Sequence, residues 1–76
     1  MKTEEYSPAR LFTQVITDIY NAGDKKAKIK FVCPRCKIVT HEAIVFVAMM
    51  KSFKDFKVTQ KITYDDGLIE LRCRHI

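Results

Sequence analysis

Phe31-Val32-Cys33-Pro34-Arg35-Cys36-Lys37 is the stretch that decides the fold of this chain, because it joins an apolar run to a Cys-x-x-Cys turn. A gap of two residues lets one turn present both sulfurs to the same metal ion. Two more zinc-compatible side chains, Cys73 and His75, stand near the other end of the chain. Three thiolates and an imidazole complete the tetrahedral ligand set of a structural zinc site. The sequence therefore predicts one structural Zn²⁺ per chain, held by Cys33, Cys36, Cys73 and His75.

The fourth ligand of this site has one alternative. Alternation along an extended strand places Cys73 and His75 on the same side, within reach of one ion. His75 is the last residue but one of the sequence, however, and chain ends fray. In that case His41, which follows Cys36 by five residues, takes its place.

The size of the chain explains why a metal would be useful. Its 76 residues, 47% hydrophobic and 30% charged, have the composition of one globular domain over residues 1–76. A core of this size leaves only a few kcal/mol of net stability. Three cysteines cannot all pair, no secretory signal precedes the domain, and the longest apolar run, 43–50, is too short to span a membrane. We therefore expect a soluble, cytoplasmic protein.

An amphipathic helix is predicted over residues 8–22. Ser7 can cap its first N–H groups, Pro8 suits the first helical position, and residues 21–23 provide the stop. This helix either packs on the sheet of its own domain or forms a homodimer or partner contact. Its apolar residues fall on one stripe, with spacings of one, three and four: Leu11, Phe12, Val15, Ile16, Ile19 and Tyr20.

Lysines and apolar residues alternate from Lys26 to Phe31, which predicts a strand with one buried face and a row of lysines on the other. With a formal net charge of +5, this row is a candidate for neutralising nucleic-acid phosphates. Solubility, or protection of an exposed edge strand, is the alternative explanation. The candidate nucleic-acid-binding residues are Lys25, Lys26, Lys28, Lys30, Arg35 and Lys37.

The segment from Ile38 to Phe56 fits two patterns. Its β-branched and aromatic residues favour a strand that continues to about Ala48. A helix from His41 to about Phe53 is the alternative, because apolar residues also recur there at helical spacing.

A C-terminal hairpin is predicted next. Residues 58, 60, 62 and 64 would share one face of its first strand, residues 65–67 would form the turn, and Leu68 would begin the return strand. This hairpin delivers Cys73 and His75.

Residues 31–36, followed by β-rich sequence and then by residues 67–75, resemble the zinc ribbon of transcription elongation and initiation factors. In that family two cysteine knuckles sit at the ends of β-hairpins. The resemblance covers about residues 28–75 and implies the same four ligands. It implies a small zinc-stabilised α+β domain, in which the N-terminal helix packs on a zinc-ribbon-like antiparallel sheet over residues 27–75. The chain departs from the family pattern at Lys37, where a glycine is common, and in its shorter second knuckle.

These observations predict a zinc-binding module that is not an enzyme and that binds nucleic acid, or a nucleic-acid-bound transcription complex, through its lysines. The alternative function is a protein-interaction adaptor that uses the helix over residues 11–20 or the apolar cluster over residues 49–56. A minor alternative is a thiol redox protein, since Cys33-Pro34-Arg35-Cys36 also resembles the turn of thioredoxin-like proteins. No His-Glu-x-x-His pattern indicates a catalytic zinc.

Overall fold

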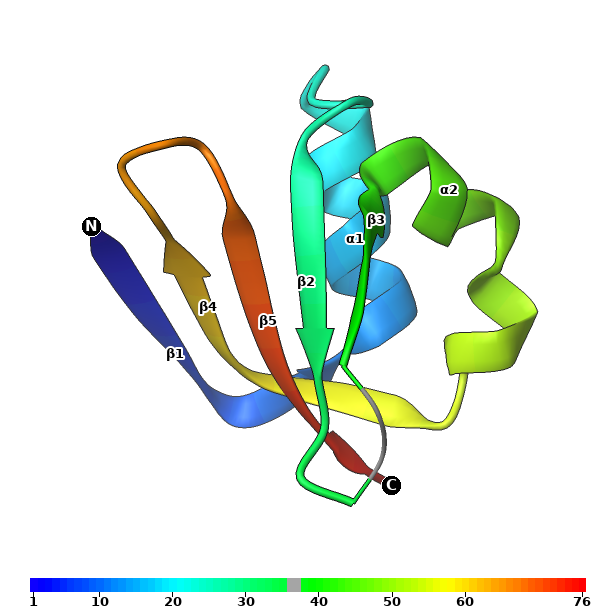
Figure 1. The fold of residues 1–76 in the computed structure, drawn as a ribbon. Coiled ribbons are helices and arrows are strands. Elements are labelled where there is room, and N and C mark those ends of the chain that lie inside the picture. Colours follow the sequence, from blue (N-terminus) through cyan, green and yellow to red (C-terminus); the bar gives the residue numbers. More distant parts are fainter. Residues whose placement is uncertain (36–37) are drawn as a thin grey trace.

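The computed structural model describes residues 1–35 and 38–76, which form a five-stranded sheet and a layer of helices (Figure 1). The sheet has the strand order β1-β4-β5-β2-β3. The protein is thus a small α+β protein, as the sequence predicts. In chain order the elements are β1 (Lys2–Leu11), α1 (Phe12–Asn21), β2 (Lys28–Val32), β3 (Val39–Glu42), α2 (Ala43–Ala48), the 3₁₀ helix η1 (Met50–Phe53), β4 (Phe56–Thr63) and β5 (Ile69–His75).

The sheet is mixed, so the prediction of a wholly antiparallel sheet is wrong. Strands β2 and β5 run parallel, from the pair Ile29 and Ile69 to the pair Val32 and Arg72, whereas the other neighbours pair antiparallel. Parallel neighbours require a long crossover between them. The crossover here is the helical segment α2–η1, which carries the chain from one edge of the sheet to β4 and so lets β5 enter beside β2 (Figure 1).

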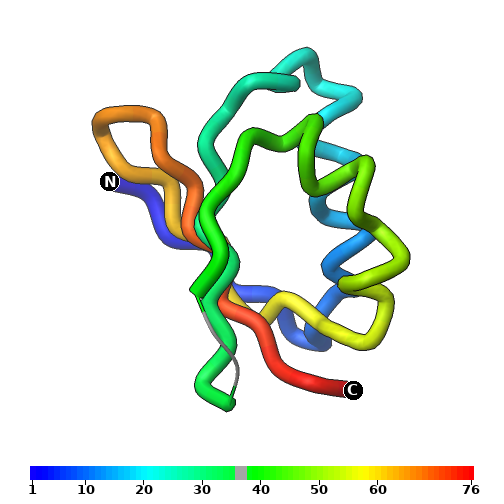
Figure 2. The backbone as a smooth tube through the Cα atoms, turned by 45° about the vertical axis from the view of Figure 1, so that its right-hand side comes forward, coloured from blue at the N-terminus to red at the C-terminus, as the bar shows by residue number. Residues whose placement is uncertain are grey.

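The helices lie on one side of the sheet and leave its other side uncovered (Figures 1 and 2). Phe12, the first residue of α1, is 0% exposed and is the centre of the core between the two layers. Its ring meets three other rings at centroid distances of 5.4 Å (Phe31), 5.5 Å (Phe46) and 5.2 Å (Phe53). These contacts tie α1 to the sheet, to α2 and to η1.

The predicted helix over residues 8–22 starts later than expected, because residues 8–11 belong to β1. The pairing of β1 with β4 shifts register between Glu5 and Arg10. Proline has no backbone N–H, so Pro8 fits at such an irregularity without losing a bond of the ladder. Residues 7–8 were predicted to begin a helix, but in the structure they interrupt the pairing of an edge strand.

Most of the predicted stripe and the end of the helix are confirmed, but Leu11 belongs to β1 and is 38% exposed. Phe12, Val15, Ile16 and Ile19 are buried against the sheet, so α1 uses its apolar face within its own domain. The helix ends at Asn21, and Gly23 follows with φ of +96°, a conformation that glycine adopts without strain.

The favoured strand over residues 43–48 is wrong, because Ala43–Ala48 forms α2. Strand β3 ends at Glu42, and the segment continues through α2 and η1, close to the alternative helix. The pattern was ambiguous because Ala43 and Phe46 must be buried in either conformation, and burial against α1 decides in favour of the helix. No helix within the described residues is long and apolar enough to cross a membrane.

The C-terminal hairpin forms as predicted, as β4 and β5 with a turn at Gly67. One detail differs. Val58 pairs with Cys73 but Gln60 pairs with the adjacent Arg72, so a bulge lies between Val58 and Gln60. Val58 therefore faces the core, whereas Gln60 faces the uncovered side, instead of the shared face that strict alternation predicts.

Candidate nucleic-acid interface and cysteine site

Strand β2 presents its side chains alternately to the two sides of the sheet. Ile29 and Phe31 are 0% and 2% exposed and belong to the core. Lys28 and Lys30 consequently lie on the uncovered side, the first exposed and the second half-buried. This alternation was predicted. Because β2 is an interior strand between β5 and β3, the alternative that these lysines protect a sheet edge is wrong.

Strands β5 and β4 add three cations to the same side. Arg72 and Arg74 are exposed and alternate with the buried Leu71 and Cys73. Lys57 pairs directly with Arg74, and directly opposed residues project from the same side of a sheet. None of these three cations was predicted as a binding residue, although the alternation of apolar and basic residues from Leu71 to Arg74 was a usable signal.

These side chains form one diagonal line across three adjacent strands. Lys28 and Lys30 lie two residues apart on one strand, about 6.6 Å, as do Arg72 and Arg74, and Lys57 lies directly opposite Arg74 at about 4.8 Å. Lys30 and Arg72 are diagonal neighbours about 8 Å apart, because Lys30 pairs with Glu70 and Arg72 pairs with Val32. The line leads from the start of β2 across β5 to the start of β4. We call it the cation band, and its members are Lys28, Lys30, Arg72, Arg74 and Lys57.

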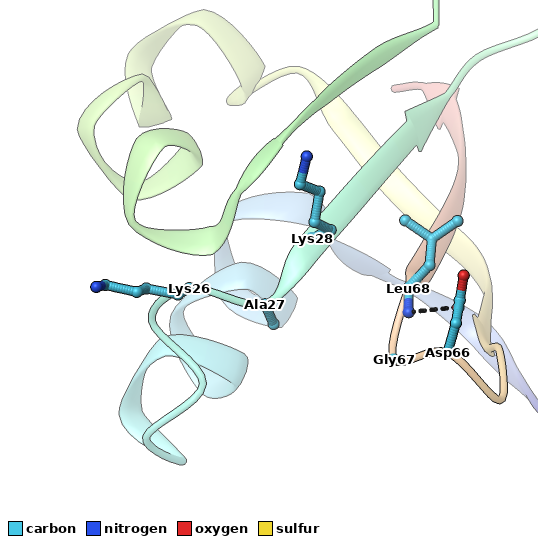
Figure 3. Close-up of a pocket in the computed structure, with 6 residues that line it drawn as sticks. All are labelled: Lys26, Ala27, Lys28, Asp66, Gly67 and Leu68. Carbon is cyan, nitrogen blue, oxygen red and sulfur yellow. Dashed lines mark hydrogen bonds between the residues drawn. The ribbon is translucent and has the colours of Figure 1, made fainter.

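The other predicted basic residues are placed elsewhere. Lys26 precedes β2 in a turn, and Figure 3 shows its side chain pointing away from Lys28, beside a cavity of about 400 Å³ that Asp66 also lines. The ammonium of Lys25 lies 5.2 Å from the ring centroid of Tyr20, on α1. Arg35 lies in the turn after Cys33, near Arg74 at the end of the band. Lys37 lies outside the described residues.

A groove of about 540 Å³ crosses the uncovered side at the middle of the cation band. Lys30 and Arg72 line it together with the apolar side chains of Val32 and Ile38. A surface that combines cations with apolar side chains suits a ligand that carries both phosphates and bases.

Glu70 lies in the floor of this groove and is only 6% exposed. One carboxylate oxygen accepts a hydrogen bond from the Tyr64 hydroxyl at 2.8 Å, and the other accepts one from Nε of Arg72 at 2.8 Å. The hydrogen bond from Arg72 keeps the pKa of Glu70 below its usual value, although burial of the carboxylate raises it. The hydrogen bond from Tyr64 and the charge of Lys30 also lower this pKa. Glu70 thus stays ionised and holds the Arg72 guanidinium at the sheet surface.

Glu70→Gln should make the protein less stable at neutral pH but remove part of its acid sensitivity. Because the folded pKa of Glu70 is lowered, the ionised carboxylate stabilises the fold above the ordinary glutamate pKa, and this contribution disappears as the pH falls through the folded pKa. We expect Tm of the variant to be about 5 °C below wild type at pH 7, and the difference to shrink as the pH falls through the lowered folded pKa of Glu70. Circular dichroism at pH 7, 5 and 3 measures both values.

Glu5→Gln is the matched control, since Glu5 is an exposed carboxylate that accepts a hydrogen bond from Gln60 on the same side of the sheet. The Tm of Glu5→Gln should differ little from that of wild type, and the difference should be about the same at pH 7, 5 and 3. A constant difference for Glu70→Gln from pH 7 to 3 would contradict the role given to the carboxylate.

Cys33 and Cys73 lie side by side at the end of the parallel pair. Val32 pairs with Arg72, so the next residue on each strand is a cysteine, at a strand spacing of about 4.8 Å. Both cysteines are free and 4% exposed. Burial, with a smaller contribution from the charge of Cys33, raises the pKa of Cys73 to about 12. The Cys73 thiol donates a hydrogen bond to the Leu71 carbonyl at 3.3 Å.

The two histidines occupy different parts of the molecule. The ring of His75 contacts that of Phe56 at a centroid distance of 4.3 Å and a tilt of 49°, and His75 lines a cavity of about 310 Å³ together with Cys33. His41 pairs with Ile29 on β2, four residues before Cys33, which corresponds to about 13 Å along an extended strand. Of the two, His75 is therefore the one next to the cysteine pair.

One of the four predicted metal ligands, Cys36, lies outside the described residues. Among residues 1–35 and 38–76, no three or more side chains of His, Cys, Asp and Glu are grouped so that they could hold a metal ion. The structure therefore brings together Cys33 and Cys73, with His75 at the same cavity.

No protein-family model, curated protein or solved structure matches the chain.

Proposed function

We propose that this protein is a nucleic-acid-binding module without enzymatic activity and that the cation band binds the backbone of a single strand. The observation that carries this proposal is the band itself, which places five cations in a line on the side of the sheet opposite to α1, α2 and η1. A protein that neutralises phosphates with such a line binds without strong base preference and with a strong dependence on salt. A flexible single strand can follow a diagonal on a twisted sheet and place its bases against Val32 and Ile38 in the groove.

The surfaces that the adaptor alternative needs are mostly used within the protein. The α1 stripe is buried, and in the cluster over residues 49–56 Phe53 and Phe56 are 8% and 9% exposed. This distribution supports the nucleic-acid proposal, because the uncovered side of the sheet carries cations and the apolar stripes face inward. The redox alternative has weak support, since Cys33, the first thiol of the turn on which it rests, is only 4% exposed, and buried thiols are poorly accessible to substrates.

We also propose that Zn²⁺ is bound by Cys33, Cys36, Cys73 and His75 and has a structural role. The donor set fits zinc, because thiolates and imidazoles are its usual protein ligands. Support comes from the adjacent, buried Cys33 and Cys73 and from His75 at the same cavity. Zinc at this place would join β2 to β5 at the end of the cation band. His41 lies on β3 opposite Ile29, four residues before Cys33 along β2. We therefore favour His75 as the fourth ligand.

Removing two cations of the band should weaken binding to a single strand about 10- to 30-fold at 0.1 M salt. The variant carries Lys28→Gln and Arg74→Gln, both at exposed positions outside the core. With one phosphate per cation, the plot of log K against log salt should have a slope near −3.5 for wild type and near −2 for the variant. Fluorescence anisotropy with labelled oligo-dT and oligo-U at several salt concentrations gives the slopes.

Lys26→Gln with Lys51→Gln is the matched control, because it removes the same charge from exposed positions off the band, before β2 and on η1. This control should bind almost as well as wild type. Equal losses in the two double variants would show that only net charge matters, and wild-type protein without salt-dependent binding would overturn the proposed function.

A further inference from the structure

Glu70 holds two different side chains on the uncovered side of the sheet. The residue is buried, and each oxygen of its carboxylate accepts one hydrogen bond of 2.8 Å, one from the Tyr64 hydroxyl and one from Nε of Arg72. A single buried carboxylate therefore fixes an aromatic ring and a guanidinium relative to each other. Arg72 belongs to the cation band, whereas Tyr64 has no part in the function proposed above.

Tyr64 directly follows β4 and lies on the same side of the sheet as the cation band. Ile62 pairs with Glu70, and two residues further along the hairpin Tyr64 lies opposite Leu68, to whose carbonyl its backbone N–H donates a hydrogen bond of 2.8 Å. Opposed residues project from the same side, so Tyr64, like Glu70, faces away from the helices. The parallel register of β2 and β5 places Lys28, the first cation of the band, next to Leu68.

The ring of Tyr64 is suited to stacking on a base. It is half-buried, so part of its surface is open to a ligand, and the hydrogen bond to Glu70 restricts its rotation. A tyrosine has few side-chain torsions, so a ring that is already held loses little entropy when a ligand binds. The other two tyrosines lie elsewhere: Tyr20 is on α1, and Tyr6 contacts Arg10 at a cavity that α1 also lines.

The guanidinium of Arg72 is suited to a phosphate. Its hydrogen bond to Glu70 uses Nε, which leaves the two terminal amino groups for a ligand, and its side chain is 55% exposed. These two groups form a fork that matches two oxygens of one phosphate. Because the ring of Tyr64 and this fork are bonded to the two oxygens of one carboxylate, a single nucleotide can span them.

We propose that Tyr64 and Arg72 form a nucleotide subsite of the cation band, in which the ring stacks on a base and the guanidinium binds the adjacent phosphate. Glu70 is the positioning residue of both. The inference rests on the proposed function and narrows its ligand to a strand with accessible bases, since a duplex keeps its bases inside the stack and a bare polyanion has none. Stacking tolerates every base, so the subsite adds affinity without selecting one base.

The test compares two strands of equal length and equal phosphate number, oligo-dT and an abasic strand, by fluorescence anisotropy at about 0.1 M salt. Wild type should bind oligo-dT about tenfold more tightly than the abasic strand, which is the order of magnitude for one stacked base. Tyr64→Leu should lose most of this preference. It should bind the abasic strand as tightly as wild type and with the same salt slope, because no cation is removed. Tyr64→Phe should keep most of the preference, since the ring remains.

Tyr20→Leu is the matched control, because it makes the same change on α1, and it should keep the full preference. Tyrosine fluorescence gives a second readout that leaves Tyr64 unchanged. The chain contains three tyrosines and no tryptophan, so a protein with Tyr6→Phe and Tyr20→Phe retains Tyr64 as its single emitter. Oligo-dT should quench this emission, and the abasic strand should not.

Equal binding of wild type to the two strands would overturn the subsite but leave the cation band intact, and so would equal quenching by both strands. A Tyr64→Phe protein that binds like Tyr64→Leu would also overturn it, because the hydroxyl and not the ring would then account for the effect. Wild-type protein without salt-dependent binding to either strand would refute the proposed function and the subsite with it.

Discussion

Phe12→Ala should leave most of the protein unfolded at 25 °C in the absence of metal. Phe12 is fully buried and its ring contacts three other phenylalanines, which come from β2, α2 and η1. Truncating such a residue costs about 3 to 5 kcal/mol, which is comparable with the whole stability of a domain of this size. Urea unfolding followed by circular dichroism measures the loss.

Leu11→Ala is the control for this prediction. Leu11 is the preceding residue, but it ends β1 and is 38% exposed, so its truncation should cost less than about 1 kcal/mol. If the two variants were equally stable, Phe12 would not be the centre of the core. A folded Phe12→Ala protein with the midpoint of wild type would contradict the packing described here.

Cys33→Ser should abolish zinc binding and remove most of its contribution to folding, which is roughly 10 to 16 kcal/mol for structural zinc in finger peptides. The serine hydroxyl is a poor ligand for zinc compared with a thiolate. Metal analysis should find one zinc in wild type and none in the variant, and a strong chelator should lower the unfolding temperature of wild type only.

The two histidines supply the control for the ligand set. His75→Ala should lower zinc affinity and unfolding temperature much more than His41→Ala, since His75 lies at the cavity that Cys33 lines. The reverse order would assign the fourth position to His41. Wild-type protein that binds no zinc, and is as stable as Cys33→Ser, would refute the metal proposal but leave the cation band untouched.

Local patterns predicted the parts of the fold that depend on neighbours in the sequence. The alternation around Lys28 and Lys30, the buried stripe of α1 and the turn at Gly67 are all of this kind. Segment 43–48 was assigned wrongly because an apolar run fits a buried strand or a buried helix equally well, and only contacts with α1 distinguish them.

Long-range pairing was outside the reach of such patterns. No local signal shows that β2 and β5 are parallel neighbours, so the line from Lys28 through Arg72 to Lys57 could not be assembled from the sequence. The proximity of Cys33 and Cys73 was predicted, but from two hairpin ends, whereas the parallel pair of β2 and β5 produces it.

The position of β5 also determines how the protein folds. Strand β1 pairs with β4, and β2 pairs with β3, but only β5 joins these two ribbons. Two-stranded ribbons are marginally stable on their own in water. Neither ribbon is therefore a stable folding unit by itself. The sheet also depends on two pairings between distant parts of the chain, Glu5 with Gln60 and Ile29 with Ile69, and even the shorter of them closes a loop of about forty residues. Folding should accordingly be a single cooperative transition, slower than that of a helical protein of equal length because of these closures.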